Sequence, residues 1–207
     1  MPVHIVNHPL VQDALVDLRD KRTVPEHFRR AATRISVLLA AEALRTVATS
    51  AVTVETPLGP ADGRRVQPDI VVVPVLRAGL GMLDAVLELV PYARVGHIGL
   101  QRDEMTAVAS RYYSKLPHDL NSSLALMIDP MLATGGSAVA ALELLASAGL
   151  QRISIVCIVA APEGIEMVER HFPTVDIYTP VVDQRLNEHK YIVPGLGDFG
   201  DRLYGTI

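Results

Sequence analysis

One stretch of this chain, residues 127–138 (MIDPMLATGGSA), constrains the fold more than any other. The apolar run at 123–128 ends in an acid, Asp129, and a loop of small residues follows at 133–137. Residues 138–148 are rich in alanine and leucine at helical spacing. We therefore expect a strand, an acid, a short glycine-containing loop and a helix. Backbone N–H groups and the positive end of the helix dipole make such a loop suitable for a phosphate.

The chemistry of this stretch is not settled by the glycines alone. An acid at the end of a strand can reach a sugar hydroxyl or a metal-bound water. The loop is not the P-loop of nucleotide triphosphatases, because the chain contains no GxxxxGK(S/T) pattern. An ordinary strand-to-helix turn that binds nothing also fits the glycines, so the context has to decide.

Apolar and β-branched runs along the rest of the chain predict further strands. We expect strands at 70–75, 94–100, 124–128, 153–160 and 175–182. A helix is expected at 83–89, and others after the strands at 124–128 and 153–160. This alternation predicts an α/β fold with a doubly wound, mostly parallel sheet. Ligands of such sheets bind outside the carboxyl ends of the strands.

Four other segments carry weaker signals. A helix is expected to begin near residues 23–26 and to continue through the apolar positions between 35 and 44. Residues 52–60 alternate and then turn, which favours half of a β-arm. Residues 104–120 are polar and weakly periodic, so we expect a mobile excursion. Three glycines and a proline at 191–202 argue against regular structure there.

Composition narrows the class of protein. The 207 residues, 49% of them hydrophobic, suffice for one large domain with its own core. A formal net charge of −4 argues against a general binder of nucleic acids or membrane surfaces. The single cysteine, Cys157, excludes a disulfide framework and is expected to be a buried strand thiol. The chain shows no secretory signal or membrane span, so we expect a cytoplasmic protein.

A second glycine-containing loop, residues 75–81 (VLRAGLG), follows the first buried strand. Gly79 and Gly81 would let the backbone approach an anion or take a positive φ. Arg77 would add a planar cation for a phosphate. A plain turn with a solvated arginine is the alternative, but two such loops at one sheet edge would form facing anion sites.

The amino-acid sequences of three segments resemble those of a known enzyme family. DPMLATGGS at 129–137 is similar to the phosphoribosyl-diphosphate (PRPP) loop of type I phosphoribosyltransferases, in the version found in uracil phosphoribosyltransferases. VPVLRAGLGM at 73–82 and the tail at 191–202 are similar to the same family. The resemblance covers nearly the whole chain. It implies one domain, 1–207, with a flexible loop, a β-arm and a C-terminal base-binding hood at about 183–207.

The resemblance also implies a reaction and its residues. The 5-phosphoribosyl group of PRPP would be transferred to N1 of uracil, giving UMP and diphosphate in pyrimidine salvage. The residues implied at the reacting centre are Arg77, Arg102, Asp129 and Asp198. PRPP is expected to contact Arg77, Ala78, Gly79, Arg102, Asp129, Pro130, Met131, Leu132, Ala133, Thr134, Gly135, Gly136, Ser137 and Asp198. Uracil is expected to contact Tyr191, Ile192, Gly197, Asp198 and Phe199, mainly through the backbone.

The hydrogen-bonding groups of an irregular backbone at 191–202 suit uracil as a ligand. Uracil presents an acceptor, a donor and an acceptor along one edge, and irregular backbone can offer the complementary groups. Cytosine would leave buried polar groups unpaired, at about 1–3 kcal/mol per group. A purine would be too large for a pocket shaped by Ile192 and the glycine-containing backbone.

Cofactor and partners are likewise implied by the resemblance. Mg²⁺ would be held mainly by PRPP and water, with Asp198 contacting it through a water. The segment from Arg102 to about residue 117 would close over the site and exclude water. A homodimer or homotetramer is expected, for which the N-terminal helix and the 52–60 arm are available. GTP is a candidate activator, because it activates some bacterial relatives, although no residue set in the sequence marks a GTP site.

The chain departs from the wider pattern in several places. Asp129 is followed by Pro130 where many type I enzymes have a second acid, and Ala133 replaces a loop acid. Both changes match the uracil branch and leave the proton acceptor for uracil N1 unassigned. Changes local to this chain are Phe199 for alanine, Gln101 for tyrosine, Ala109 for proline and Lys190 for glycine.

Two alternative functions stay open on the sequence. A non-catalytic nucleotide sensor of the same fold would bind RNA or DNA, but the chain has no lysine and arginine stripe. A transferase for another base would need a different tail, and an orotate site would need an additional cation.

Overall fold

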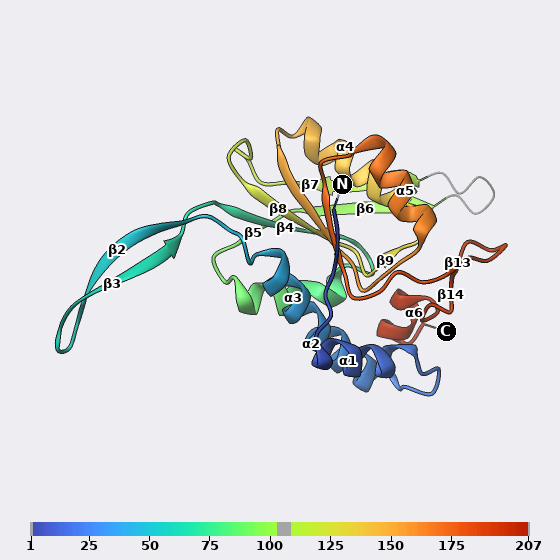
Figure 1. Ribbon diagram of the computed structural model, residues 1–207. Helices are drawn as coiled ribbons and strands as arrows, with labels where there is room; N and C mark the ends of the chain where they lie inside the picture. Colours follow the sequence, from blue (N-terminus) through green and yellow to red (C-terminus); the bar gives the residue numbers. More distant parts are fainter. Residues whose placement is uncertain (1, 103–108, 207) are drawn as a thin grey trace.

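A mostly parallel β-sheet forms the centre of the computed structural model, which describes residues 2–102 and 109–206 (Figure 1). Its strands are β1 (Val3–Ile5), β4 (Ile70–Leu76), β5 (Arg94–Val95), β6 (His97–Arg102), β7 (Ala109–Lys115), β8 (Leu124–Ile128), β10 (Arg152–Val156) and β12 (Asp176–Thr179). Their order in space is β1-β12-β10-β8-β4-β6-β7, with β5 paired to β4. Only the pair of β6 and β7 is antiparallel among these described strands. The predicted doubly wound α/β sheet is confirmed.

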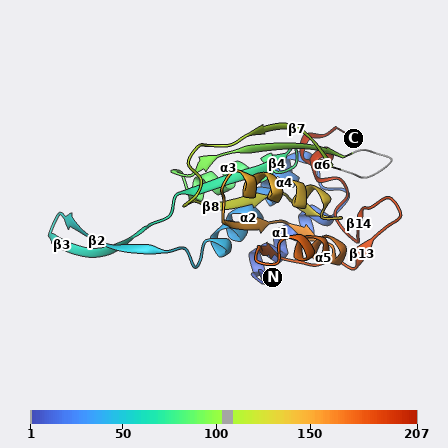
Figure 2. The same cartoon turned by 90° about the horizontal axis from the view of Figure 1, so that it is seen from above.

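Helices cover both faces of the sheet, which is why its central strands are apolar along their whole length. One face carries α1 (Pro9–Arg19), α2 (Pro25–Ala43), α3 (Leu80–Leu89) and α6 (Phe199–Tyr204), and the other carries α4 (Gly136–Ser147) and α5 (Pro162–His171) (Figures 1 and 2). Successive residues of β4 point to opposite faces, so Val72 lies in one buried core and Val71 in the other. The same alternation along β8 places Leu126 with the first core and Met127 with the second.

The chain connections reverse direction between β4 and β8. From β4 the chain crosses through α3 to β6, whereas from β8 it crosses through α4 to β10 on the opposite side. The two strands lie side by side in parallel register, with Pro74 opposite Ile128. Connections therefore diverge at their carboxyl ends, where such sheets bind their ligands.

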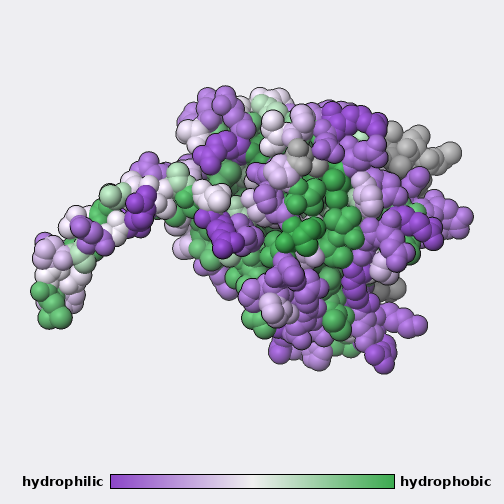
Figure 3. All heavy atoms as spheres, viewed as in Figure 1, coloured by the Kyte–Doolittle hydropathy of each residue, from purple (hydrophilic) through white to green (hydrophobic). Residues whose placement is uncertain are grey.

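Two short strand pairs and one long hairpin complete the fold. They are β9 (Met131–Leu132) with β11 (Val159–Ala160), β13 (Arg185–Leu186) with β14 (Ile192–Val193), and β2 (Thr49–Thr56) with β3 (Gly59–Val66). The last pair is the predicted β-arm, and it projects far from the body (Figures 1 and 2). Its tip is apolar, because Leu58 is 100% exposed there (Figure 3).

Several boundaries and two elements differ from the sequence predictions. The strand expected at 94–100 is split into β5 and β6, and that at 153–160 into β10 and β11. The strand expected at 175–182 is confined to β12, and α3 begins at Leu80 instead of residue 83. β1 and α1 were not predicted.

Two predictions of irregular structure were wrong in part. Residues 109–115 of the expected mobile excursion form the regular strand β7. Its pairing with β6 supplies backbone partners that a polar sequence does not reveal. Residues 103–108 of that excursion lie outside the described residues. The tail at 191–202 contains β14 and most of α6, whose first turn is capped by the Asp198 side chain.

Two further expectations concern the cysteine and the membrane. Cys157 is fully buried, as predicted, but it lies directly after the end of β10 and not within a strand. Over residues 2–102 and 109–206, no helix has both the length and the apolar character to cross a bilayer.

Candidate active site

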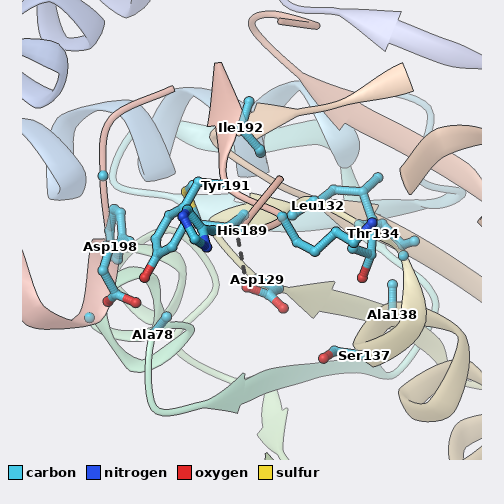
Figure 4. Close-up of a pocket in the computed structure, with 18 of the residues that line it drawn as sticks. Ala78, Asp129, Leu132, Thr134, Ser137, Ala138, His189, Tyr191, Ile192 and Asp198 are labelled. Atoms are coloured by element: carbon cyan, nitrogen blue, oxygen red, sulfur yellow. Dashed lines mark hydrogen bonds between the residues drawn. The ribbon is translucent and has the colours of Figure 1, made fainter. Parts of the chain in front are cut away.

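A cavity of about 720 Å³ opens at the carboxyl ends of β4 and β8, in the crevice where the connections diverge. It is lined by Ala78, Met127, Asp129, Met131, Leu132, Ala133, Thr134, Gly135, Ser137, Ala138, Ile155, His189, Lys190, Tyr191, Ile192, Gly197, Asp198, Phe199 and Gly200. In Figure 4, Asp129 lies between Thr134 and Ser137 on one side and Asp198 and Ala78 on the other. The loop at 129–137 and the C-terminal tail thus face each other across one cavity.

The loop after β8 is fixed by backbone hydrogen bonds to the next strand along. Ile158 and Val159 both donate their N–H groups to the carbonyl of Pro130, at 2.9 and 3.0 Å. The N–H group of Ala161 donates to the carbonyl of Leu132 at 2.8 Å. These bonds build the β9–β11 pair, so the loop is preorganised before any ligand binds.

Two glycines bring this loop close to α5. Gly135 has φ +80°, and a Cβ there would lie 2.7 Å from the Cβ of Met167. A Cβ on Gly164, in α5, would lie 2.6 Å from the carbonyl oxygen of Ala133. The first helical bond of α4 runs from Val139 to Gly135, so the N–H groups of residues 136–138 precede the helical bonding pattern. A phosphate at this turn would meet those N–H groups.

Asp129 is the acid of the pocket with a strongly perturbed ionisation. Its side chain is half-buried where β8 ends, and desolvation raises its pKa to about 7. A hydrogen bond from the Met131 N–H group to Oδ1, at 3.3 Å, acts in the opposite direction but is the smaller effect. The carboxyl group of Asp129 lines the cavity and can accept hydrogen bonds from a bound ligand.

The loop after β4 meets the pocket through Ala78. Gly79 is required by close packing and not by a positive φ, because a Cβ would lie 2.5 Å from the carbonyl oxygen of Ile128. The N–H group of Gly79 donates to Val75 at 2.8 Å, so it is engaged within the turn. Arg77 is exposed and does not line the cavity; its Nη2 lies 3.7 Å from Oδ1 of Asp201.

The tail forms the opposite wall. The β13–β14 hairpin leads into Gly195 and Gly197, which have φ +58° and +81°. A Cβ on Gly195 would lie 2.1 Å from the carbonyl oxygen of Ile192, so only glycine fits this turn. Asp198 is exposed and caps α6 by accepting a hydrogen bond from Asp201 N–H at 2.9 Å. The Phe199 ring packs edge-on against the Phe28 ring, with 5.1 Å between the two centroids. The core therefore accommodates phenylalanine at this position, where alanine was expected from the family resemblance.

The cavity gathers most of the residues predicted to bind PRPP and all of those predicted to bind uracil. Gly79, Pro130 and Gly136 lie beside the cavity in its framing turns without lining it. Arg102 ends β6, but its side chain lies outside the described part of the chain. Within residues 2–102 and 109–206, no three His, Cys, Asp or Glu side chains converge as a metal site.

Sequence reasoning missed six lining residues: Met127, Ala138, Ile155, His189, Lys190 and Gly200. Met127 and Ile155 belong to buried strands, and strand periodicity does not tell which side chain ends at a cavity. His189 and Lys190 lie within the predicted base-binding hood, directly before the residues named as uracil contacts, and could have been found as an extension of that set. Lys190 has φ +64°, which explains why glycine suits this position.

A doubly wound sheet with a preorganised phosphate-sized loop facing a glycine-containing tail defines the type I phosphoribosyltransferase class. The adenine phosphoribosyltransferase of Thermoanaerobacter pseudethanolicus shares the fold, with a TM-score of 0.51 and 16% identity over 74% of this chain and 81% of that one. The sequence matches the profile of uracil phosphoribosyltransferase over residues 5–206. The chain belongs to the uracil phosphoribosyltransferase family.

Several relatives match the chain over nearly its whole length. The uracil phosphoribosyltransferase of Dictyoglomus thermophilum is 52% identical over 205 residues, or 99% of both chains. That of Thermus thermophilus is 48% identical over 211 residues, or 100% of both chains. The solved structure of the AQ2163 protein from Aquifex aeolicus has a TM-score of 0.94 at 38% identity, covering 98% of each chain.

Proposed function

We propose that the cavity between residues 129–137 and the tail transfers the 5-phosphoribosyl group of PRPP to N1 of uracil, yielding UMP and diphosphate. Family membership makes the chain an enzyme, a pentosyl-transferring glycosyltransferase. The observation that carries the assignment of this cavity is that the phosphate-sized loop and the base-recognition segment share it. We take residues 1–207 as one functional unit, with 183–207 as the base-recognition segment.

In this proposal the protein holds PRPP at its 5′-phosphate and at its ribose hydroxyls. The 5′-phosphate binds the N–H groups at the start of α4, with the hydroxyl groups of Thr134 and Ser137 beside it. Asp129 accepts hydrogen bonds from the ribose hydroxyls, and its carboxylate offsets positive charge that develops on the ring. Because the 5′-phosphate and the ribose hydroxyls are both held, C1 of the ribose is fixed for in-line attack by uracil.

The leaving diphosphate takes the place next to β4. Arg77 and Arg102 supply cations, and the turn at Ala78 and Gly79 supplies close backbone. The Arg77–Asp201 pair is long and exposed, so it is weak and leaves the guanidinium free to turn to a substrate. Charge on the diphosphate is then stabilised by arginine rather than by water.

The carboxylates of the pocket fit a magnesium ion that is shared with the substrate. Asp129 and Asp198 are oxygen donors of the kind that Mg²⁺ prefers, but two single carboxylates are too few for a dedicated cage. We therefore propose that Asp198 contacts the ion through a water while PRPP supplies most ligands. When bound, Mg²⁺ would neutralise charge on the leaving diphosphate.

Uracil is recognised by the tail backbone. The positive φ angles of Gly195 and Gly197 turn successive peptide groups, which allows both donors and acceptors to face one ligand edge. Tyr191, Ile192 and Phe199 complete the predicted uracil contacts at this wall. A pocket of fixed donors and acceptors rejects cytosine because unpaired buried groups cost about 1–3 kcal/mol each.

Three finer points belong to the same proposal. The enzyme acts in the cytoplasm as a homodimer or homotetramer, supported by an arm whose surface is largely exposed. GTP is proposed as an activator on the strength of the family resemblance alone. No nucleic acid or membrane partner is proposed.

A coupled assay tests the reaction. Purified protein, PRPP, Mg²⁺ and uracil are scored for UMP, with cytosine and orotate in parallel. UMP from uracil alone, reduced at least ~100-fold in Asp129→Asn and Arg77→Ala, is expected if both loops act on PRPP. Bound PRPP without product from any base would favour a non-catalytic sensor.

A further inference from the structure

A buried acid outside the cavity holds the tail in place. Asp183 precedes β13, and its side chain is only 5% exposed. Its Oδ2 accepts a hydrogen bond from the N–H group of Gly195 at 2.8 Å. Asp183 therefore fixes one polar group of the turn that leads to the uracil wall.

The matching cation comes from the other end of the chain. Arg19, the last residue of α1, donates from Nη2 to Oδ1 of Asp183 at 2.7 Å and from Nη1 to Oδ2 at 3.0 Å. The same Nη1 donates to the carbonyl of Gly195 at 2.9 Å. Arg19 and Asp183 together thus bind both the N–H group and the carbonyl of Gly195.

A second arginine holds the next carbonyl of the tail, without a hydrogen-bonded aspartate side chain as partner among the described residues. Arg202 donates to the carbonyl of Leu196 at 2.8 Å and to that of Asp20 at 2.6 Å. It also donates to the carbonyl of Leu18 and lies over the Phe28 ring, 4.5 Å from its centroid. The carboxyl end of α1 is therefore tied to two consecutive peptide units of the tail (Figure 1).

The hydrogen bonds to Gly195 and Leu196 hold the two residues that directly precede the cavity-lining backbone. Residues 197–200 line it, whereas Arg19, Asp183 and Gly195 do not. A recognition surface made of backbone has no side chains to adjust, so its accuracy depends on what holds the chain. Charge-assisted, bidentate hydrogen bonds hold a peptide unit more firmly than neutral ones.

We propose that Arg19 and Asp183 are positioning residues for the base, which fix Gly195 so that the following backbone meets the uracil edge. This role rests on the proposed reaction, and it assigns no contact between either residue and a substrate. Removing the bidentate geometry should loosen the uracil wall, whereas the backbone bonds that hold the PRPP loop on β9 and β11 involve neither side chain. Asp198, the one predicted PRPP contact in the tail, keeps its own capping bond from the Asp201 N–H group.

The test measures KM for uracil, KM for PRPP and kcat in Arg19→Lys, Asp183→Asn and the double variant. Lysine keeps the charge but not the fork, and asparagine keeps the shape but not the charge. We expect each single variant to raise KM for uracil at least ~10-fold while KM for PRPP stays within ~2-fold. The double variant should be little worse than either single one, because both break the same unit.

Arg94→Lys is the matched control. Arg94 also donates to an aspartate, Asp69, and to a backbone carbonyl, but it does so at the amino end of β4, away from the carboxyl end where the cavity opens. It should lower the melting temperature without moving KM for uracil.

Four results would overturn the positioning role. They are an unchanged KM for uracil, equal rises in both KM values, a pattern like that of Arg94→Lys, or loss of folding in both conservative variants. Absence of UMP from the wild-type protein would instead contradict the proposed reaction itself, so the two failures are distinguishable.

Discussion

The carboxyl group of Asp129 shows how a single residue can serve the site at the expense of the fold. Desolvation raises its pKa from 3.8 to about 7. Between these values the folded protein holds a proton that the unfolded chain releases, so stability falls as pH rises from about 4 to 7. Above pH 7 the full cost of this partly desolvated charge is present in the ligand-free protein.

Asp129→Asn should therefore stabilise the ligand-free protein while it abolishes most activity. We expect the free energy of unfolding to rise by about 1–3 kcal/mol at pH 8 relative to wild type, because no charge is buried. At pH 4 the difference should largely vanish. Urea unfolding at both pH values measures this. A difference that is independent of pH would contradict the assigned ionisation.

Cys157 makes a second prediction at the scale of one residue. Burial raises the pKa of its thiol to about 12, and the side chain is fully buried. The thiolate is the reactive species, so the native protein should resist alkylation at neutral pH. Mass spectrometry after iodoacetamide treatment should find labelling only when urea unfolds the chain. Rapid labelling of the native protein would show that this part of the sheet opens.

At the scale of elements, the turn between β9 and α4 requires glycine at position 135 but not at position 136. Gly135→Ala should cost about 2 kcal/mol or more, because φ is +80° and the new Cβ would meet Met167 and the Gly164 carbonyl. UMP formation should fall as the phosphate loop shifts.

The adjacent glycine is the control for this junction. At Gly136 the nearest atom to a new Cβ is 3.8 Å away, so Gly136→Ala should be neutral or stabilising by up to about 1 kcal/mol. Thermal unfolding of both variants checks the pair. Equal effects would mean that the loop yields to the added methyl group.

The same elements show which parts of the fold a sequence can predict. β4 and β8 were predicted almost to the residue, because strands buried on both faces are apolar throughout. β1 has only three residues, and its pairing with β12 is a contact across the whole chain, so no local pattern reveals it. α1 did carry a signal, since Pro9 begins it and Val11, Leu15 and Leu18 recur at helical spacing.

The candidate site was predictable where it is local in sequence and not where it is assembled by folding. Residues 129–137 and the tail form two compact motifs, and both line the cavity. Arg19 and Asp183 lie 164 residues apart, and neither has a sequence environment that distinguishes it from other charged residues. Tertiary structure alone brings them together.

At the scale of the whole molecule, the arm is the feature that the single chain does not explain. Residues of β2 and β3 are exposed or half-buried, and none is buried. An isolated two-stranded hairpin is marginally stable in water. Leu58 is fully exposed at the tip and Val54 is 43% exposed. An arm of this kind gains stability when it lies on another surface, which agrees with the proposed homo-oligomer.

Shortening the arm separates folding from assembly. Ser50 and Arg65 lie opposite each other, so an Asn-Gly turn can join them in place of the intervening residues. We expect the body to keep its helical circular dichroism spectrum, because neither buried core includes residues 51–64. Light scattering should show a smaller assembly than the intact chain forms. The single change Leu58→Ser serves as a milder variant, which should weaken the assembly without altering the fold. If the shortened protein kept its full assembly mass, the arm would not be part of the interface and the exposed face of another element would have to hold the copies together.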